Sequence, residues 1–159
     1  MQPRYYSISS SSIVHAHQIA ITAVVSDKRM AGEAVIPGLC TNHLLGLQKS
    51  FLGQEGTETR VNAHVRKSTF KTPANMAAPI VMVAAGMGVA PFRAFLQERA
   101  RMQRMGREIG RTVLFFGCRN ERQDFLYCEE LTICAIVGNT TAREWFRPYT
   151  SGLFIPSVD

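Results

Sequence analysis

The sequence has few of the features that mark disulfide-rich, metal-binding or membrane-spanning proteins. Its four cysteines include no Cys-x-x-Cys pair and follow no secretory leader, so we expect a reducing compartment and no disulfide framework. His15 and His17 have no third ligand near them in the sequence, so we expect no metal site. The longest apolar run is too short to span a bilayer, and no basic stretch is interleaved with aromatic residues. These absences argue against a membrane segment and against nucleic acid as a partner.

The residues that are present fit a soluble globular protein with an anionic ligand. The chain has 159 residues, of which 46% are apolar and 19% charged, enough for one ordinary domain or two incomplete ones. The net charge of +6 comes from Lys and Arg residues spread singly along the chain, and anionic cofactors would account for it.

The stretch from Pro3 to Ser12 predicts a short strand that ends in a serine-rich edge. On it, Arg4 offers a planar fork that suits a pyrophosphate, and Tyr6 offers a flat ring for stacking on a planar cofactor. Ser7 falls on the opposite face from Tyr6, so a twist or bulge would have to bring it in. An ordinary solvent-edge strand with a serine-rich turn gives the same pattern. Residues 18–26 predict a second, mostly buried strand.

A glycine turn followed by a short helix comes next, over residues 38–47. Thr41 is the expected N-cap, and free N–H groups at a helix start can hold an anion. A capped helix without a ligand remains the alternative. We expect a loop over residues 50–60, a further strand over residues 61–66, and a linker over residues 71–79.

The middle of the chain predicts a strand, a glycine turn and a helix. Residues 79–85 are a short apolar run typical of a buried parallel strand, and Gly86-x-Gly88 follows with Pro91 at a helix start. In the helix, Arg93 and Gln97 fall on the side expected to face solvent. Residues 111–116 predict the next parallel strand, whose carboxyl end carries Cys118 and Arg119, where open α/β sheets bind ligands. Arg119 is either a phosphate contact or a surface arginine.

Three motifs occur in the order in which one family has them. They are Arg-Tyr-Tyr-Ser-Ile-Ser-Ser from residue 4, Ala-Gly-Met-Gly-Val-Ala-Pro-Phe from residue 85, and Phe-Phe-Gly-Cys-Arg-Asn from residue 115, followed by Asp124-Phe-Leu-Tyr127. Together they resemble the ferredoxin–NADP reductase family, and within it the branch of the NADPH–cytochrome P450 reductases, over residues 3–131. One departure is Met87, which stands where the family usually has threonine and cannot donate its hydrogen bond.

The resemblance implies FAD and NADPH as cofactors and Ser7 as the catalytic residue, hydrogen-bonded near the reactive flavin nitrogen. It implies that the cofactors are bound by Arg4, Tyr5, Tyr6, Ser7, Thr22, Ala23, Val24, Gly38, Leu39, Cys40, Thr41, Gly86, Gly88, Cys118 and Arg119.

The expected fold class is mixed α+β and α/β. The resemblance implies a partial antiparallel flavin-binding β-barrel over residues 1–75, then the first half of a Rossmann-like parallel α/β nucleotide-binding domain over residues 76–134. Residues 135–159 do not match the family, and we expect them to be irregular. Strands before Arg4, the segment that grips the 2′-phosphate, the FMN domain and the membrane anchor of such reductases have no counterpart, so we expect a fragment shortened at both ends.

The implied function is oxidoreduction. Hydride passes from NADPH to FAD, and electrons pass onward through FMN to a haem protein such as cytochrome P450, on the cytoplasmic side of the endoplasmic reticulum membrane. Whether this chain is itself an enzyme stays open at this point. The alternative is a non-catalytic remnant that binds nucleotide weakly or not at all, which Met87 and the missing parts favour. A simple NAD-binding module is disfavoured by the flavin motif.

Overall fold

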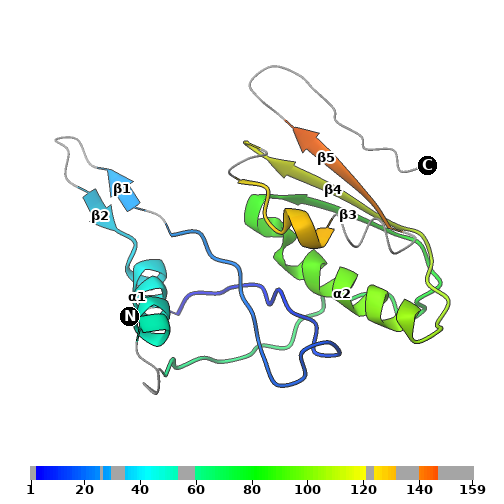
Figure 1. Cartoon of the computed structure of the whole chain (residues 1–159), viewed down its shortest axis with the longest axis horizontal. Helices are drawn as coiled ribbons and strands as arrows, with labels where there is room; N and C mark the ends of the chain where they lie inside the picture. The colour runs from blue at the N-terminus through cyan, green and yellow to red at the C-terminus, as the bar shows by residue number, and fades with distance from the viewer. Residues whose placement is uncertain are drawn as a thin grey trace. The chain divides into compact units, whose positions relative to one another are not determined.

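We analysed a computed structural model of the whole chain, shown in Figure 1, in which two compact units can be distinguished. The structure describes residues 3–25, 27–29, 35–53, 60–120, 124–131 and 140–146. The first unit takes its residues from Met1–Tyr6 and Ala23–Thr69, and the second from Ser7–Thr22 and Phe70–Asp159. The elements are β1 (Asp27–Arg29), β2 (Val35–Pro37), α1 (Leu39–Gly53), β3 (Ile80–Ala85), η1 (Gly86–Val89), α2 (Ala90–Arg104), β4 (Thr112–Cys118) and β5 (Thr140–Phe146).

The second unit is built on a parallel sheet in the order β3-β4-β5, with α2 connecting β3 to β4 (Figure 1). The two strands predicted from residues 79–85 and 111–116 are confirmed as β3 and β4, with Ile80 paired to Thr112 and Ala85 to Gly117. Alternate strand residues are buried, and their side chains form the core with residues of η1, α2 and the turn of helix at 128–131. The core residues are Met82, Ala84, Val89, Leu96, Leu114, Phe116 and Leu131.

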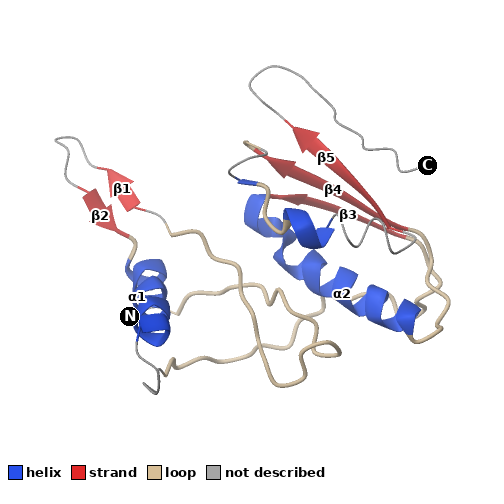
Figure 2. Cartoon of the chain, viewed as in Figure 1, coloured by secondary structure: helices blue, strands red, loops and turns tan. Residues whose placement is uncertain are grey.

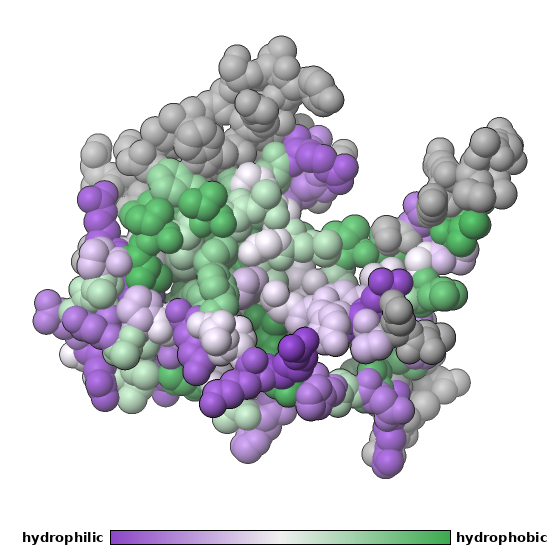
Figure 3. All heavy atoms as spheres, turned by 180° about the vertical axis from the view of Figure 1, so that it is seen from behind, coloured by the Kyte–Doolittle hydropathy of each residue, from purple (hydrophilic) through white to green (hydrophobic). Residues whose placement is uncertain are grey.

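The remaining residues of β3 point to the other side of the sheet and are exposed. Val81 and Val83 keep 68% and 71% of their surface accessible. Figure 3, which shows the molecule from behind, shows hydrophobic residues gathered on the part of the molecule that holds this sheet. Parallel sheets usually have both faces covered, so within the described residues this sheet is covered on one face only.

Residues 140–146 correct one expectation. We predicted that the chain beyond residue 134 is irregular, yet β5 pairs in parallel with β4, with Thr112 opposite Thr140 and Cys118 opposite Phe146. Thr140, Thr141, Trp145 and Phe146 are residue types that favour strands, but the segment has no run of apolar residues like those of β3 and β4. Pairing with the edge of β4 supplies its hydrogen-bond partners. The rest of the predicted tail lies outside the described residues.

Helix α2 starts where its sequence predicts. One of its own residues, the buried Arg99, bonds the helix to the segments before β3 and β4. Pro91 lies in its first turn, where a missing N–H costs nothing. Arg99, only 2% exposed, donates from Nε to Thr112 Oγ1 over 2.8 Å and from Nη2 to the Gly110 carbonyl over 2.7 Å. A third bond, from Nη2 to the Ala78 carbonyl at 3.2 Å, ties the helix to the segment that precedes β3.

The first unit contains the β1–β2 hairpin and α1. The strands pair antiparallel, with Lys28 opposite Ile36. The helix was predicted near residues 38–47 with Thr41 as its N-cap; it begins at Leu39, and Thr41 lies inside its first turn, so the N-cap assignment is wrong. The helix also continues to Gly53, over four residues that we assigned to a loop, and the hydroxyl of Ser50 donates to the Gly46 carbonyl at 3.1 Å within it.

Three further predicted strands are not formed as continuous strands. Figure 2 shows the described residues 3–25 and 60–79 as loops, and the pairing of residues 3–12 with 18–26 is reduced to an isolated antiparallel bridge between Ile8 and Ile21. The predicted strand at residues 61–66 is likewise irregular and exposed. A strand is stable only with hydrogen-bonding neighbours, and each of these segments has at most one in the described part of the chain. The parallel sheet and helices agree with the expected fold class, while the barrel remains a proposal.

Among the described residues, no helix is both long and apolar enough to cross a membrane.

Candidate functional site

The first candidate site lies at the amino end of α1, in the first unit. The phenol of Tyr6 donates a hydrogen bond of 3.4 Å to Sγ of Cys40, the second residue of the helix. Gly38 precedes the helix, and its carbonyl accepts from the backbone N–H of Asn42 at 3.0 Å and from the Asn42 side chain at 2.9 Å. These bonds fix the glycine turn and bring the aromatic motif at the start of the chain to the turn predicted to hold phosphates.

Two groups at this turn are suited to an anion. The hydroxyl of Thr41 is buried without a hydrogen-bond partner in the first turn of the helix, where backbone N–H groups also lack intrahelical partners. Arg4 is exposed and close enough to Tyr6 for its positive charge to act on the phenol. A cation, an orphan hydroxyl and a helix amino end are the chemistry that binds a pyrophosphate.

The pKa of Tyr6 reflects these surroundings. The hydrogen bond that its phenol donates to Cys40 raises the pKa of Tyr6 above its ordinary value, and partial burial raises it further. The positive charge of Arg4 lowers this pKa and so offsets part of the effect. The phenol is therefore neutral at physiological pH and stays a hydrogen-bond donor.

The other residues predicted for the flavin lie around this turn with less defined roles. Tyr5 is 71% exposed, and its ring lies under the guanidinium of Arg66 at 5.3 Å. Leu39 is 76% exposed at the helix start, Val24 is exposed, and Ala23 is half-buried. The structure therefore leaves their assignment to a flavin as a prediction.

The second candidate site lies at the carboxyl edge of the sheet in the second unit. Gly86 follows β3 with φ of +50°, a backbone conformation that favours glycine, and opens the short helix η1 that leads into α2. Gly88 is exposed, and a Cβ placed there would meet no atom within 4 Å, so a ligand can approach the backbone closely. Between them, Met87 is 46% exposed.

The neighbouring strand contributes to the same edge. Because Ala85 pairs with Gly117, Cys118 and Arg119 follow directly beside the glycine turn. Cys118 is half-buried, whereas the Arg119 side chain is 91% exposed and donates from Nε to the Asp124 carboxylate at 3.0 Å. An exposed ion pair of this kind contributes little to stability, so Arg119 can turn toward a phosphate at small cost.

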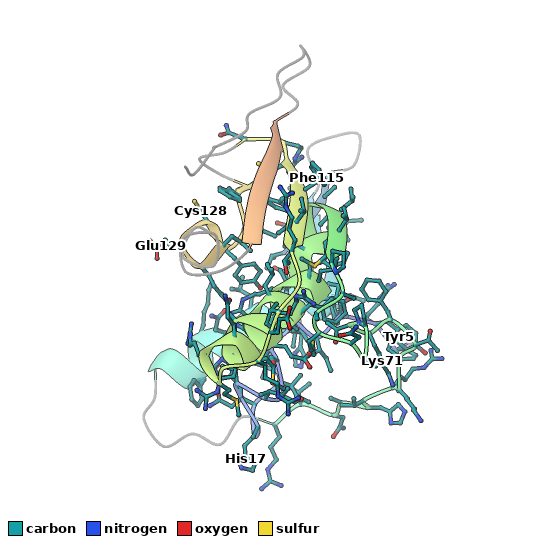
Figure 4. The ribbon with its side chains drawn as sticks, turned by 90° about the vertical axis from the view of Figure 1, so that its right-hand side faces the viewer. Tyr5, His17, Lys71, Phe115, Cys128 and Glu129 are labelled. Atoms are coloured by element: carbon teal, nitrogen blue, oxygen red, sulfur yellow. The ribbon has the colours of Figure 1, made fainter. Side chains whose placement is uncertain are left out.

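The remaining two predicted residues, Ser7 and Thr22, belong to the second unit. Ser7 is exposed, and Thr22 shares a hydrogen bond with the hydroxyl of Tyr127. We did not predict this contact from the sequence, nor the bonds that Arg93 and Gln97 make, because we expected both of these side chains to face solvent. Their spacing of four residues on one helix face is the signal that could have found them. Figure 4 shows the exposed Cys128 and Glu129 at the outer side of the helical turn that follows Tyr127.

In the described part of the chain, no group of three or more His, Cys, Asp or Glu side chains could hold a metal ion.

Comparison with known protein families gives two matches in the order of the two candidate sites. Residues 1–43 match the FAD binding domain, and residues 82–144 match the oxidoreductase NAD-binding domain. The first range ends just after the glycine turn of the first site. The second begins inside β3 and ends inside β5. It therefore extends past residue 131, where the resemblance of the sequence motifs to the family ends.

Comparison with curated proteins finds relatives that share one protein name. The chain is 45% identical over 148 residues to NADPH–cytochrome P450 reductase of Aspergillus fumigatus, covering 82% of this chain and 21% of that protein. The same identity and coverage hold for the enzyme of that name from Aspergillus oryzae. The human protein of that name is 43% identical over 131 residues, covering 82% of this chain and 19% of the relative. The chain thus spans about a fifth of the length of the curated relatives it matches.

Proposed function

The chain is homologous to part of the NADPH–cytochrome P450 reductases, and from this premise we propose that it supplies the FAD- and NADPH-binding part of an electron-transfer oxidoreductase. The proposal divides the chain into a flavin-binding part over residues 1–75 and a nucleotide-binding part over residues 76–134. In this proposal the electron acceptor is a haem protein of the cytochrome P450 type, reached through an FMN domain, at the cytoplasmic side of the endoplasmic reticulum membrane.

The first site fits the pyrophosphate of FAD. Arg4 would pair with its charge, the buried hydroxyl of Thr41 and the free N–H groups at the start of α1 would donate to its oxygens, and Gly38 would let the phosphates approach the backbone. The ring of Tyr6, held by its bond to Cys40, would pack against the flavin. Ser7 and Thr22 are proposed as flavin contacts because the resemblance of their motifs implies it.

The second site fits the phosphates of NADPH. The open space at Gly88 admits a ligand to the backbone, and Arg119 can exchange its exposed carboxylate partner for a phosphate. Cys118 lies beside the glycine turn on the neighbouring strand. When bound, the cofactors would supply the chemistry, which is transfer of a hydride (two electrons with one proton) from NADPH to FAD with NADP⁺ as the product and onward transfer of the electrons to the acceptor.

One observation carries the proposal. The hydrogen bond between Tyr6 and Cys40 joins two parts of the flavin motif that are 34 residues apart in the sequence. Without this contact, the aromatic motif and the glycine turn would be two unrelated local patterns.

The test is anaerobic reduction of the purified 159-residue chain after reconstitution with FAD. We expect a bound yellow flavin whose visible absorbance is lost when NADPH is added. Dithionite serves as the control that the bound flavin is reducible. A colourless protein after reconstitution would overturn the proposal and favour the remnant that binds no nucleotide. A bound flavin bleached by dithionite and not by NADPH would leave flavin binding and remove the NADPH step.

A further inference from the structure

Residues 7–22 form a segment whose two ends both lead into the other compact unit. The chain passes from the first unit to the second between Tyr6 and Ser7, and back between Thr22 and Ala23. Near its ends, the segment is closed on itself by the bridge between Ile8 and Ile21. A backbone bond of 2.8 Å from Ser9 N–H to the Ala20 carbonyl adds to this closure. Whatever holds this segment therefore also fixes the positions of Ser7 and Thr22 within the second unit.

An ion pair anchors the first part of the segment. Arg93 of α2 is 18% exposed in its side chain, and its Nε donates to Glu130 Oε2 at 2.7 Å. Its Nη1 donates to the carbonyl oxygen of Ser9 at 2.9 Å. Ser9 is completely buried, so the charge-assisted bond reaches a backbone group that water does not reach.

Gln97, one helical turn further along α2, extends the anchor. Its Oε1 accepts the backbone N–H of Ser11 at 3.0 Å, and its Nε2 donates to Glu130 Oε1 at 2.7 Å. Both carboxylate oxygens of Glu130 are therefore used, one by each residue of α2. A network in which every member is bonded on both sides fixes one geometry.

Tyr127 anchors the other end. Its hydroxyl bonds Thr22, the last residue of the segment in the second unit, and its ring lies under the guanidinium of Arg93, with the carbon 4.5 Å from the ring centre. Its backbone has φ of +61°, which a bulky residue adopts only when its surroundings require it. The strained backbone is held in place by contacts on both the ring and the hydroxyl.

We propose that Arg93, Gln97, Tyr127 and Glu130, which we call the clamp, are positioning residues that hold the flavin-side segment 7–22 on the unit that carries the nicotinamide-side glycine turn. This inference rests on the proposed function. Of the residues proposed to bind a cofactor, the clamp bonds Thr22, through the hydroxyl of Tyr127. It acts through Ser9, Ser11 and Thr22 on the segment that begins at Ser7, while α2, which carries Arg93 and Gln97, begins directly after η1.

A loosened clamp would change the position of Ser7 relative to the glycine turn at Gly86, both within the second unit, and would leave the contacts at the turn before α1 unchanged. Hydride transfer depends steeply on the geometry of the reacting atoms, whereas binding of each cofactor depends on its own site. The clamp therefore predicts a loss in the rate of flavin reduction at saturating NADPH, with unchanged dissociation constants for FAD and NADPH. A role in folding alone would lower the melting temperature and cofactor binding without this separation.

The test compares Glu130→Gln with Glu129→Gln in the FAD-reconstituted chain. Glu129 is the matched control because it is the preceding residue of the same helical turn and is exposed (Figure 4). We expect flavin reduction by NADPH to slow at least tenfold in Glu130→Gln and to be unchanged in Glu129→Gln. We also expect faster amide hydrogen exchange at Ser11, whose N–H is held by Gln97.

A second variant keeps the proposal testable if Glu130→Gln does not fold. Tyr127→Phe removes only the hydroxyl that bonds Thr22 and keeps the ring under Arg93, so it should fold and still slow reduction severalfold. Reduction at the wild-type rate in both variants would overturn the clamp while leaving the proposed function intact. So would weaker FAD binding with an unchanged reduction rate. A wild-type chain that NADPH does not reduce would overturn the proposed function and the clamp's role with it.

Discussion

At the scale of single residues, Arg99 shows how a charged side chain can serve as a structural link. Its guanidinium is buried at the amino end of the sheet and bonds one side chain and two backbone carbonyls. Burial lowers the pKa of Arg99, but a guanidinium stays charged in proteins. The residue thus ties α2, the linker before β3 and the start of β4 to one point.

Replacing this arginine should destabilise the second unit. Arg99→Met keeps the length of the side chain but removes the arginine's bond to the Ala78 carbonyl and leaves the Gly110 carbonyl with only the Thr112 hydroxyl at 3.3 Å, so we expect a loss of about 2–4 kcal/mol in the free energy of unfolding. Urea unfolding followed by circular dichroism measures it. Arg104→Met, at an exposed position in the last turn of the same helix, is the control and should cost less than about 1 kcal/mol. Equal losses in the two variants would contradict the structural role of Arg99.

Met87 allows a test of the second site. Threonine at this position would add a hydroxyl donor beside the predicted nicotinamide, and one such bond is worth about 0.5–1.5 kcal/mol, roughly threefold to tenfold in affinity. We therefore expect Met87→Thr to bind NADPH more tightly by that factor in a fluorescence titration. Met87→Val has the shape of the threonine variant without the hydroxyl and should not gain. A gain of the same size in both variants would point to shape and not to hydrogen bonding.

The bond between Tyr6 and Cys40 predicts a dependence on pH. Because the folded-state pKa of Tyr6 is raised, its contribution to stability is fully present below the ordinary pKa of tyrosine and is lost as the pH rises through the folded-state value. The difference in phenolate absorbance between the wild type and Tyr6→Phe isolates this titration. Cys40→Ala should move it to lower pH by removing the largest cause of the shift. An unchanged titration in Cys40→Ala would show that the phenol does not donate to the thiol.

At the scale of elements, the sequence was informative where an element finds its partners nearby in the chain. The strands β3 and β4 and the helix between them were predicted because short apolar runs and a glycine turn define this unit locally. The side of α2 that carries Arg93 and Gln97 was misassigned because the residues that it bonds, Ser9 and Ser11, lie 84 and 86 residues away in the sequence. The same reason explains β5, whose strand character depends on the edge of β4 and not on its own pattern.

The candidate sites divide in the same way. Glycines such as Gly38 and Gly86 could be assigned from turn chemistry, whereas the bond that brings Tyr6 to Cys40 could not, because no local pattern specifies a contact over 34 residues. The strands predicted at residues 3–12, 18–26 and 61–66 had suitable patterns, but their partners are not provided by the described residues.

Two glycines should respond in opposite ways to alanine. Gly46 lies within α1 with open space where a Cβ would be, so Gly46→Ala should stabilise the chain by about 0.5–1 kcal/mol. A Cβ at Gly110 would lie 2.2 Å from the Ala77 carbonyl oxygen, so Gly110→Ala should destabilise it by several kcal/mol, on the order of 3. Thermal unfolding of the two variants measures both effects. Stabilisation by Gly110→Ala would contradict the packing of the linker against the loop before β4.

At the scale of the whole molecule, the chain combines two cofactor-binding segments in a length that is about a fifth of its relatives. The flavin motif is divided between the units, with Arg4 and Tyr6 in the first and Ser7 and Thr22 in the second. We propose two separate devices for these residues: one that binds the flavin phosphates in the first unit and one that positions Ser7 and Thr22 within the second unit. We assign the first to the turn before α1 and the second to the clamp.

The most direct test of this account is a comparison of FAD and riboflavin binding by the wild type and Arg4→Ala. Riboflavin has the ring system without the pyrophosphate, and a charge-assisted hydrogen bond is worth about 1.5–3 kcal/mol, which corresponds to roughly tenfold to a hundredfold in affinity. Isothermal titration calorimetry should therefore show Arg4→Ala binding FAD at least tenfold more weakly than the wild type, with equal affinity for riboflavin. An FAD affinity that does not change, or a wild type that binds no flavin, would contradict the account.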